Sequence, residues 1–165
     1  MAFVARLVVK DEHGERPVRV YQSDATVALH SDSGWLVTPQ TPISHAVSSA
    51  LWFGPAANGA GLYEARVADG GSAFYGQRID ISRNGYLGAY SGEETGAYLA
   101  LKAPDGAMLA AAGTVAGVTL QNADGQPVGL GGATGEVLYL QVEGGESVAF
   151  ELTIEAVGVP SPVAG

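Results

Sequence analysis

Apolar and polar residues alternate with a period of two along several short segments of the chain. Such alternation is typical of β-strands that turn one face to the core and the other to solvent. Each segment is bounded by Gly, Asp, Asn or Pro, which are common turn residues. The pattern predicts an all-β protein with strands within residues 3–9, 18–21, 27–30, 79–82, 98–101, 138–142 and 148–154.

One region, residues 43–52, is also compatible with a helix. Pro42 favours a turn before it, and Pro55 would end a helix after it, because proline fixes φ and lacks an N–H donor. The region is short, and both the helical and the non-helical interpretation stay open.

The strand pattern repeats along the chain, in residues 26–37, 78–88 and 117–128. Each copy has an apolar-x-apolar strand, a polar turn that contains Gly, and a second apolar strand. We predict equivalent turn positions for Gly34, Gly85 and Gly125. We also predict that the second apolar residues of the first strands face one core; these are Leu29, Ile81 and Leu120.

A strand and a turn precede each copy, and a partial fourth copy in residues 139–154 closes the chain. Three such units resemble a β-trefoil, and the segments 31–36 (SDSGWL) and 82–87 (SRNGYL) are similar to the hairpins of fascin-like trefoils. The resemblance covers residues 3–155 and implies a β-trefoil-like barrel with a lectin-like role. The alternative is a jelly-roll β-sandwich, because residues 136–155 would equally suit the last hairpin of that fold.

The composition limits the possible partners. An apolar fraction of 47% with 15% charged residues indicates a folded core and excludes a disordered chain. A net charge of −9 and the lack of a basic cluster argue against nucleic acid and anionic lipid as partners. The chain has no cysteine, which excludes disulfides and sulfur-ligated metals.

The length favours one domain, predicted at residues 1–157, followed by a flexible tail at 158–165. No segment has the apolar length of a membrane span, and residues 1–10 lack the pattern of a cleavable signal. The expected location is therefore the cytoplasm, or outside the cell by a route without a cleavable signal.

The candidate chemistry is sparse, and we expect neither a catalytic site nor a cofactor. The three histidines, His13, His30 and His45, lack the short spacings of a zinc site. The sequence contains no nucleophile elbow, Walker loop, dinucleotide-binding glycine pattern or EF-hand loop. Residues 129–132 have the glycines of a phosphate loop without its lysine, and are interpreted as a turn. The acidic pairs are expected in solvated turns, and are Asp11/Glu12, Glu93/Glu94 and Glu143/Glu146.

Aromatic residues are the strongest candidates for binding. Trp35, Tyr86 and Tyr21 are expected to pack within the hairpins. Trp52 is followed by a segment rich in Gly, Ala, Pro and Asn, so either it packs inward as a cap or it lies on a displayed loop. We assign ligand contact to Trp52 on such a loop, with Tyr90 as the next candidate for an exposed ring.

The leading functional hypothesis is a non-catalytic recognition module whose partner is a glycan or a protein surface, and carbohydrate binding is its most concrete form. Flat rings suit the C–H faces of sugars, and the turn with Asn122, Asp124 and Gln126 offers polar contacts to hydroxyls. A second hypothesis is a structural or assembly protein, such as a capsid-decoration or fibre-associated subunit that acts as a homo-oligomer. A toxin component is the third.

Overall fold

The computed structural model describes residues 1–12, 14–21, 34–42, 47–57, 61–91, 96–106, 111–134, 137–143 and 146–162. These residues form β-strands and no helix, which confirms the all-β prediction. The strands are β1 (Phe3–Asp11), β2 (Gly14–Pro17), β3 (Arg19–Val20), β4 (Leu36–Pro39), β5 (Leu51–Pro55), β6 (Leu62–Val67), β7 (Arg78–Ile81), β8 (Leu87–Tyr90), β9 (Leu99–Lys102), β10 (Gly113–Asn122), β11 (Val128–Thr134), β12 (Val137–Val142), β13 (Glu146–Ser147) and β14 (Phe150–Val157).

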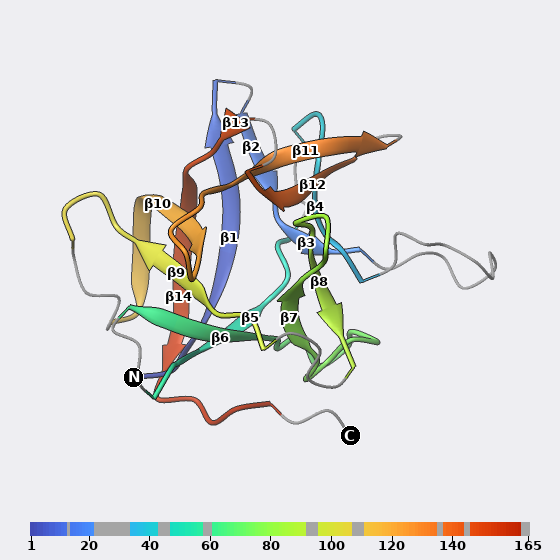
Figure 1. The fold of residues 1–165 in the computed structure, drawn as a ribbon. Coiled ribbons are helices and arrows are strands. Elements are labelled where there is room, and N and C mark those ends of the chain that lie inside the picture. The colour runs from blue at the N-terminus through green and yellow to red at the C-terminus, as the bar shows by residue number, and fades with distance from the viewer. Residues whose placement is uncertain are drawn as a thin grey trace.

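Six of these strands close into an antiparallel barrel (Figure 1). The ring runs β1–β14–β10–β9–β6–β5 and returns to β1, with each neighbouring pair hydrogen-bonded. Alternate residues of β1 face the interior, so Phe3, Ala5, Leu7 and Val9 are buried. The closed ring distinguishes the fold from the jelly-roll alternative, in which two sheets stack face to face.

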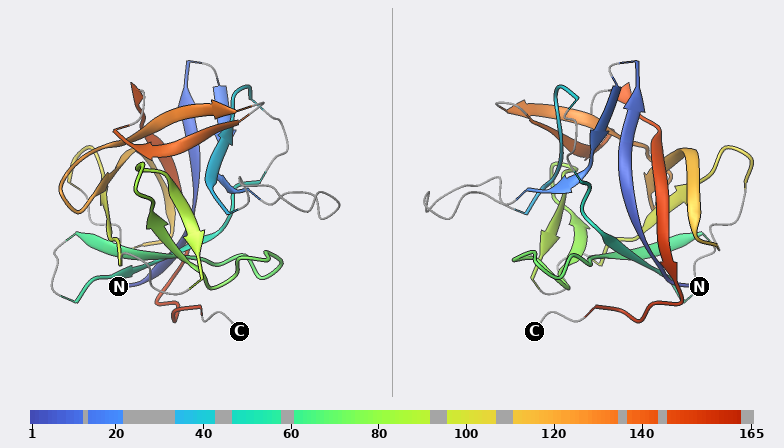
Figure 2. Two further views of the ribbon diagram at one scale, coloured as in Figure 1. Left: turned by 45° about the vertical axis from the view of Figure 1, so that its right-hand side comes forward. Right: turned by 180° about the vertical axis from the view of Figure 1, so that it is seen from behind.

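Three hairpins lie beside the barrel. Along the sequence, each comes between two strands of the barrel. The first hairpin, β3–β4, comes between β1 and β5. The second, β7–β8, comes between β6 and β9, and the third, β11–β12, comes between β10 and β14. Figure 1 shows the hairpins grouped to the right of β1, and Figure 2 shows them from two further sides.

The hairpins contact one another in a repeated register. Trp35 pairs with Gly88, Tyr86 with Gln141, and Tyr139 with Val37. In each pair, the aromatic residue of one hairpin meets the residue two positions after the aromatic residue of the next. Trp35, Tyr86 and Tyr139 therefore occupy equivalent positions in an approximately three-fold arrangement.

The predicted equivalence of the three glycines is correct for two of them. Gly34 and Gly85 directly precede the equivalent rings and have φ values of 97° and 88°. The third equivalent position is Leu138, whereas Gly125 lies in the turn between β10 and β11. The prediction for Gly125 is wrong because the alternation of β10, a barrel strand, resembles that of a hairpin strand.

The structure corrects one further sequence interpretation and decides another in part. The partial fourth copy is not a separate unit, because Tyr139 lies in the third hairpin and β14 closes the barrel. A helix within 43–52 is excluded for residues 47–52, which form an irregular segment and then the start of β5, while 43–46 lie outside the described residues.

One buried cluster takes in residues from β1 to β14, including Phe3, Phe53 and Phe150. Leu120 belongs to this cluster and Ile81 packs against it half-buried, as predicted, while Leu29 lies outside the described residues. The N–H of Gly158 donates to the carbonyl of Ala2 at 2.7 Å, which joins the residue after β14 to the residue before β1. Figure 2 shows the start of β1 and the segment directly after β14 on the same side of the barrel.

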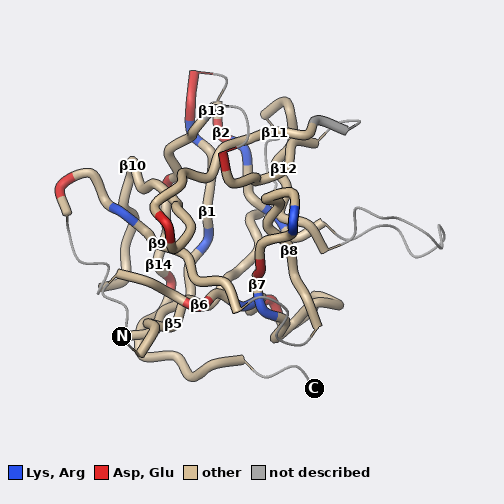
Figure 3. Tube along the Cα trace, viewed as in Figure 1, with Lys and Arg blue, Asp and Glu red and all other residues tan. Residues whose placement is uncertain are grey.

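Charged side chains are dispersed over the described trace. Figure 3 shows the basic positions, in blue, on separate parts of the trace. Arg6 lies on β1, Arg78 on β7 and Lys102 on β9. None of the described residues forms a helix that is long and apolar enough to cross a membrane.

Candidate ligand-binding site

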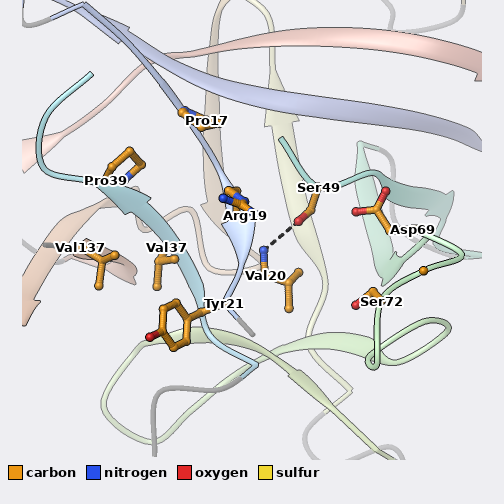
Figure 4. A pocket seen from close by; sticks show the side chains of 11 residues that line it. Pro17, Arg19, Val20, Tyr21, Val37, Pro39, Ser49, Asp69, Ser72 and Val137 are labelled. Carbon is orange, nitrogen blue, oxygen red and sulfur yellow. Dashed lines mark hydrogen bonds between the residues drawn. The ribbon is translucent and has the colours of Figure 1, made fainter. Parts of the chain in front are cut away.

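A cavity of about 470 Å³ opens beside the first hairpin (Figure 4). Its walls come from β2, β3, β4 and β12, from the segment before β5, and from the loop after β6. The residues that line it are Pro17, Arg19, Val20, Tyr21, Val37, Pro39, Ser49, Asp69, Gly71, Ser72 and Val137.

Hydrogen bonds fix the strand that carries the central wall of this cavity. The N–H of Val20 donates to Ser49 Oγ at 2.9 Å, and the N–H of Ser49 donates to the carbonyl of Val18 at 3.0 Å (Figure 4). The buried hydroxyl of Thr38 donates to the carbonyl of Pro17 at 2.9 Å. Strand β3 is thereby held between β4 and the segment before β5.

The cavity has one apolar side and one polar side. In Figure 4, Val37, Pro39 and Val137 lie on one side, and Asp69 and Ser72 lie on the other. Arg19 and Val20 lie between them, and alternation along β3 leaves Arg19 exposed while Val20 is buried. Tyr21 follows β3 and lies at the edge of the apolar side (Figure 4).

Asp69 is a positioned hydrogen-bond acceptor on the polar side. Its Oδ2 accepts the N–H of Ala50 at 3.0 Å, and its Oδ1 lies 3.8 Å from Arg6 Nη2. Arg6 also pairs with Glu155 at 2.9 Å, so its charge is shared between two carboxylates. The side chain of Asp69 keeps 32% exposure, which leaves room for a ligand hydroxyl.

Arg19 differs from most basic residues of the protein. Arg6, Arg16, Arg66 and Arg78 each lie within 4 Å of a carboxylate oxygen. Within the part of the chain that the structure describes, the exposed guanidinium of Arg19 has no ion pair and no hydrogen bond. Its donors are available to a ligand in the cavity.

The sequence analysis did not select the residues of this cavity as a site. Arg19 carried one signal, since it is a cation between Val18 and Val20 on the polar face of an alternating segment. Asp69 and Ser72 flank Gly70 and Gly71, which indicates a turn. Nothing in the linear pattern shows that this turn lies opposite the first hairpin.

Trp52 lies in barrel strand β5 with 7% exposure, so the expectation of a surface loop is wrong. Its ring covers Gly54, where a Cβ atom would lie 2.0 Å from the ring, and its Nε1–H donates to the carbonyl of Val159 at 2.8 Å. The segment after β14, expected to form a tail, thus lies against the indole. The alternation of Leu51, Trp52 and Phe53 places the indole on the outer face of the barrel, because the other two side chains belong to the core cluster.

The polar turn after β10 is held by its own side chains. Asn122 Nδ2 donates to Gln126 Oε1 at 2.8 Å, and Asn122 Oδ1 accepts the N–H groups of Asp124 and Gln126 at 3.1 and 2.8 Å. Asp124 itself is exposed. Asn122 also lines a second, smaller cavity of about 290 Å³ between this turn, β9 and the start of β6, together with Leu62, Lys102 and Gln121.

The structure does not bring the predicted site residues together in one cavity. Tyr90 ends β8 half-buried, with its ring 6.1 Å from that of Trp35 in a T-shaped arrangement. Trp52 and the turn with Asn122, Asp124 and Gln126 belong to other parts of the barrel. None of these five residues lines the larger cavity.

The described residues contain no group of three or more potential metal ligands. His13, His30, His45, Glu93 and Glu94 lie outside the described residues. Residues 129–132, interpreted above as a turn, lie within β11. No family model matches the chain, and no curated protein is significantly similar to it.

Proposed function

We propose that the protein is a non-catalytic recognition module that binds a saccharide in the cavity beside the first hairpin. The observation that carries this proposal is the pairing of an apolar wall with a polar wall across about 470 Å³. Ligand cavities commonly measure about 300–1,000 Å³ and combine apolar surface with a few positioned polar groups. A sugar ring presents both kinds of surface, C–H faces and hydroxyl edges.

Each wall has a defined role in this proposal. Val37, Pro39 and Val137 pack against the C–H face of the sugar. Asp69 accepts hydrogen bonds from hydroxyls, which is favoured because Ala50 and Arg6 already hold its carboxylate in one orientation. Arg19, which lies between the two walls, donates hydrogen bonds to the sugar.

We also propose that the fold is a β-trefoil, with a likeness to lectin-like members. Each of three units contributes two strands to the barrel and one hairpin to its side. The repeated register at Trp35, Tyr86 and Tyr139 supports the same interpretation. An experimental structure whose units superpose by three successive rotations of about 120° would test it, and two stacked open sheets would contradict it.

The binding proposal is tested with a glycan array, followed by calorimetry on the glycan that binds best. Asp69→Asn removes the charge of the acceptor and keeps its shape, and we expect the affinity to fall at least about tenfold. The matched control is Asp124→Asn, the same change at the exposed turn after β10. We expect it to bind as the parent does.

Three outcomes would contradict this assignment. Loss of binding in Asp124→Asn alone would move the site to the turn with Asn122 and Gln126. An array without any bound glycan would refute the saccharide proposal. A stable oligomer in light scattering, combined with such an empty array, would favour the assembly hypothesis instead.

A further inference from the structure

The cavity contains an unmatched positive charge. Among the described residues that line it, Arg19 is the only lysine or arginine. Its guanidinium is exposed and has no partner within the described chain, although the protein carries a net charge of −9 and pairs most of its other arginines with carboxylates. A cation left unpaired in an acidic protein is available for an anionic ligand.

We infer that the saccharide bound in this cavity carries one carboxylate, which Arg19 binds. The inference rests on the proposed function and names its ligand class, acidic sugars such as uronic acids. The planar guanidinium donates two parallel hydrogen bonds to a carboxylate, and such charge-assisted pairs are stronger than neutral ones. The sugar hydroxyls meet Asp69 on the polar side of the cavity.

The strand geometry supports this role because it fixes the base of the Arg19 side chain. Arg19 pairs with Val37 in the β3–β4 ladder, and its neighbour Val20 is tied to Ser49. Only the side chain itself loses freedom when a ligand binds, which limits the entropic cost of ordering it.

The charges around the cavity limit the ligand to a single acidic group. Asp69 lines the same cavity, and Arg6, which pairs with Asp69, also pairs with Glu155. A second anionic group near Asp69 would be repelled, and a net charge of −9 opposes the approach of a polyanion. Highly sulfated polysaccharides, which require clustered cations, are therefore poor candidates.

The test uses the full chain on an array that holds acidic glycans beside their carboxyl-reduced counterparts. Methyl glucuronide and methyl glucoside then serve as a matched pair of soluble probes, followed by saturation-transfer NMR and calorimetry. We expect at least about tenfold weaker binding when the carboxylate is replaced by a hydroxymethyl group. We also expect the affinity for the acidic probe to fall with added salt, because an exposed charge pair is screened.

Two variants connect this effect to Arg19. Arg19→Ala is expected to remove the preference for the acidic probe, and Arg19→Lys to retain part of it, because lysine keeps the charge and loses the planar fork. Arg83→Ala makes the same charge change at an exposed position in the turn between β7 and β8, outside the cavity lining, and is expected to bind as the parent does. Melting temperatures check that each variant is folded.

The outcomes separate this inference from the proposed function. Equal binding of acidic and neutral glycans, or an unchanged preference in Arg19→Ala, would overturn the inference and leave saccharide binding intact. Binding of sulfated glycans alone would also overturn it. An array without any bound glycan would refute both.

Discussion

The indole of Trp35 lies directly on Gly88 of the neighbouring hairpin. A Cβ atom built at Gly88 would lie 2.6 Å from Trp35 Cε3 and 3.0 Å from Cζ3, which is closer than two carbon atoms approach without a shift. The backbones also meet here, because Trp35 and Gly88 form a β-bridge and the N–H of Ala89 donates to the carbonyl of Gly34 at 2.7 Å. The contact between the first and second hairpins therefore requires that residue 88 has no side chain.

Gly88→Ala should destabilise the protein by about 1–3 kcal/mol, the typical cost of overpacking a close contact. Chemical denaturation followed by circular dichroism measures the change. Gly70→Ala is the control, since a Cβ at that glycine meets nothing within 4 Å. Equal unfolding midpoints for the two variants would show that the contact between Trp35 and Gly88 does not stabilise the hairpins.

The sequence predicted the strands well and their assignment to units only in part. Alternation of apolar and polar residues identifies a strand. It does not distinguish Val118 and Leu120 in barrel strand β10 from Ile79 and Ile81 in hairpin strand β7, because both pairs have the same spacing. Their difference lies in pairing partners far along the chain. Local pattern therefore aligned Gly125 with Gly34 and Gly85, although the ring pairing places Leu138 there.

The candidate site was harder to predict for a related reason. The cavity joins Arg19 and Val37 of the first hairpin to Asp69 and Ser72 of the loop after β6, and Val137 of β12 completes it. These residues come from separate strands and loops, and only the closed barrel brings them together. The prediction of a surface loop at Trp52 was wrong because Gly54 and Pro55 indicate a loop in the sequence. In the structure, Gly54 provides the space in which the indole lies.

Trp52→Ala should destabilise the protein by about 3–5 kcal/mol, the usual cost of removing a buried aromatic side chain. The indole is 7% exposed and also loses its hydrogen bond to Val159. The measurement is thermal and chemical unfolding. A variant that melts with the parent would show that this side chain is not part of the packed barrel.

Removal of the residues after Val157 also tests the packing of the Trp52 indole. A chain that ends at Val157 lacks the carbonyl that accepts the indole N–H. In a Trp35→Phe background, Trp52 is the sole fluorophore of its kind, and we expect its emission to shift to the red when residues 158–165 are removed. Unchanged emission would contradict the contact.

Leu120→Ala should cost about 2–5 kcal/mol, because Leu120 is 1% exposed within the core cluster. Ile81→Ala should cost less, since Ile81 is half-buried at the end of β7. Val157→Ala, at a side chain with 40% exposure, is the control. Denaturant midpoints measure all three, and a larger loss for Ile81 than for Leu120 would contradict the observed register.

Stability should fall at alkaline pH in part because of Tyr63. Its ring packs against Phe3 at 5.5 Å and Phe53 at 6.4 Å, and burial raises the pKa of its hydroxyl above the ordinary value. The folded state therefore holds this proton more tightly than the unfolded state does. The resulting contribution is fully present below the unfolded pKa of about 10 and is lost as the pH rises through the folded pKa.

Tyr63→Phe should accordingly make the free energy of unfolding less sensitive to pH above about 10. Urea unfolding at a series of pH values from 8 upwards, on the order of half-unit steps, measures the slope. Tyr75→Phe removes a hydroxyl from a ring that is 39% exposed and serves as the control. If both variants decline with pH as steeply as the parent, burial of the Tyr63 hydroxyl does not contribute to the alkaline loss of stability.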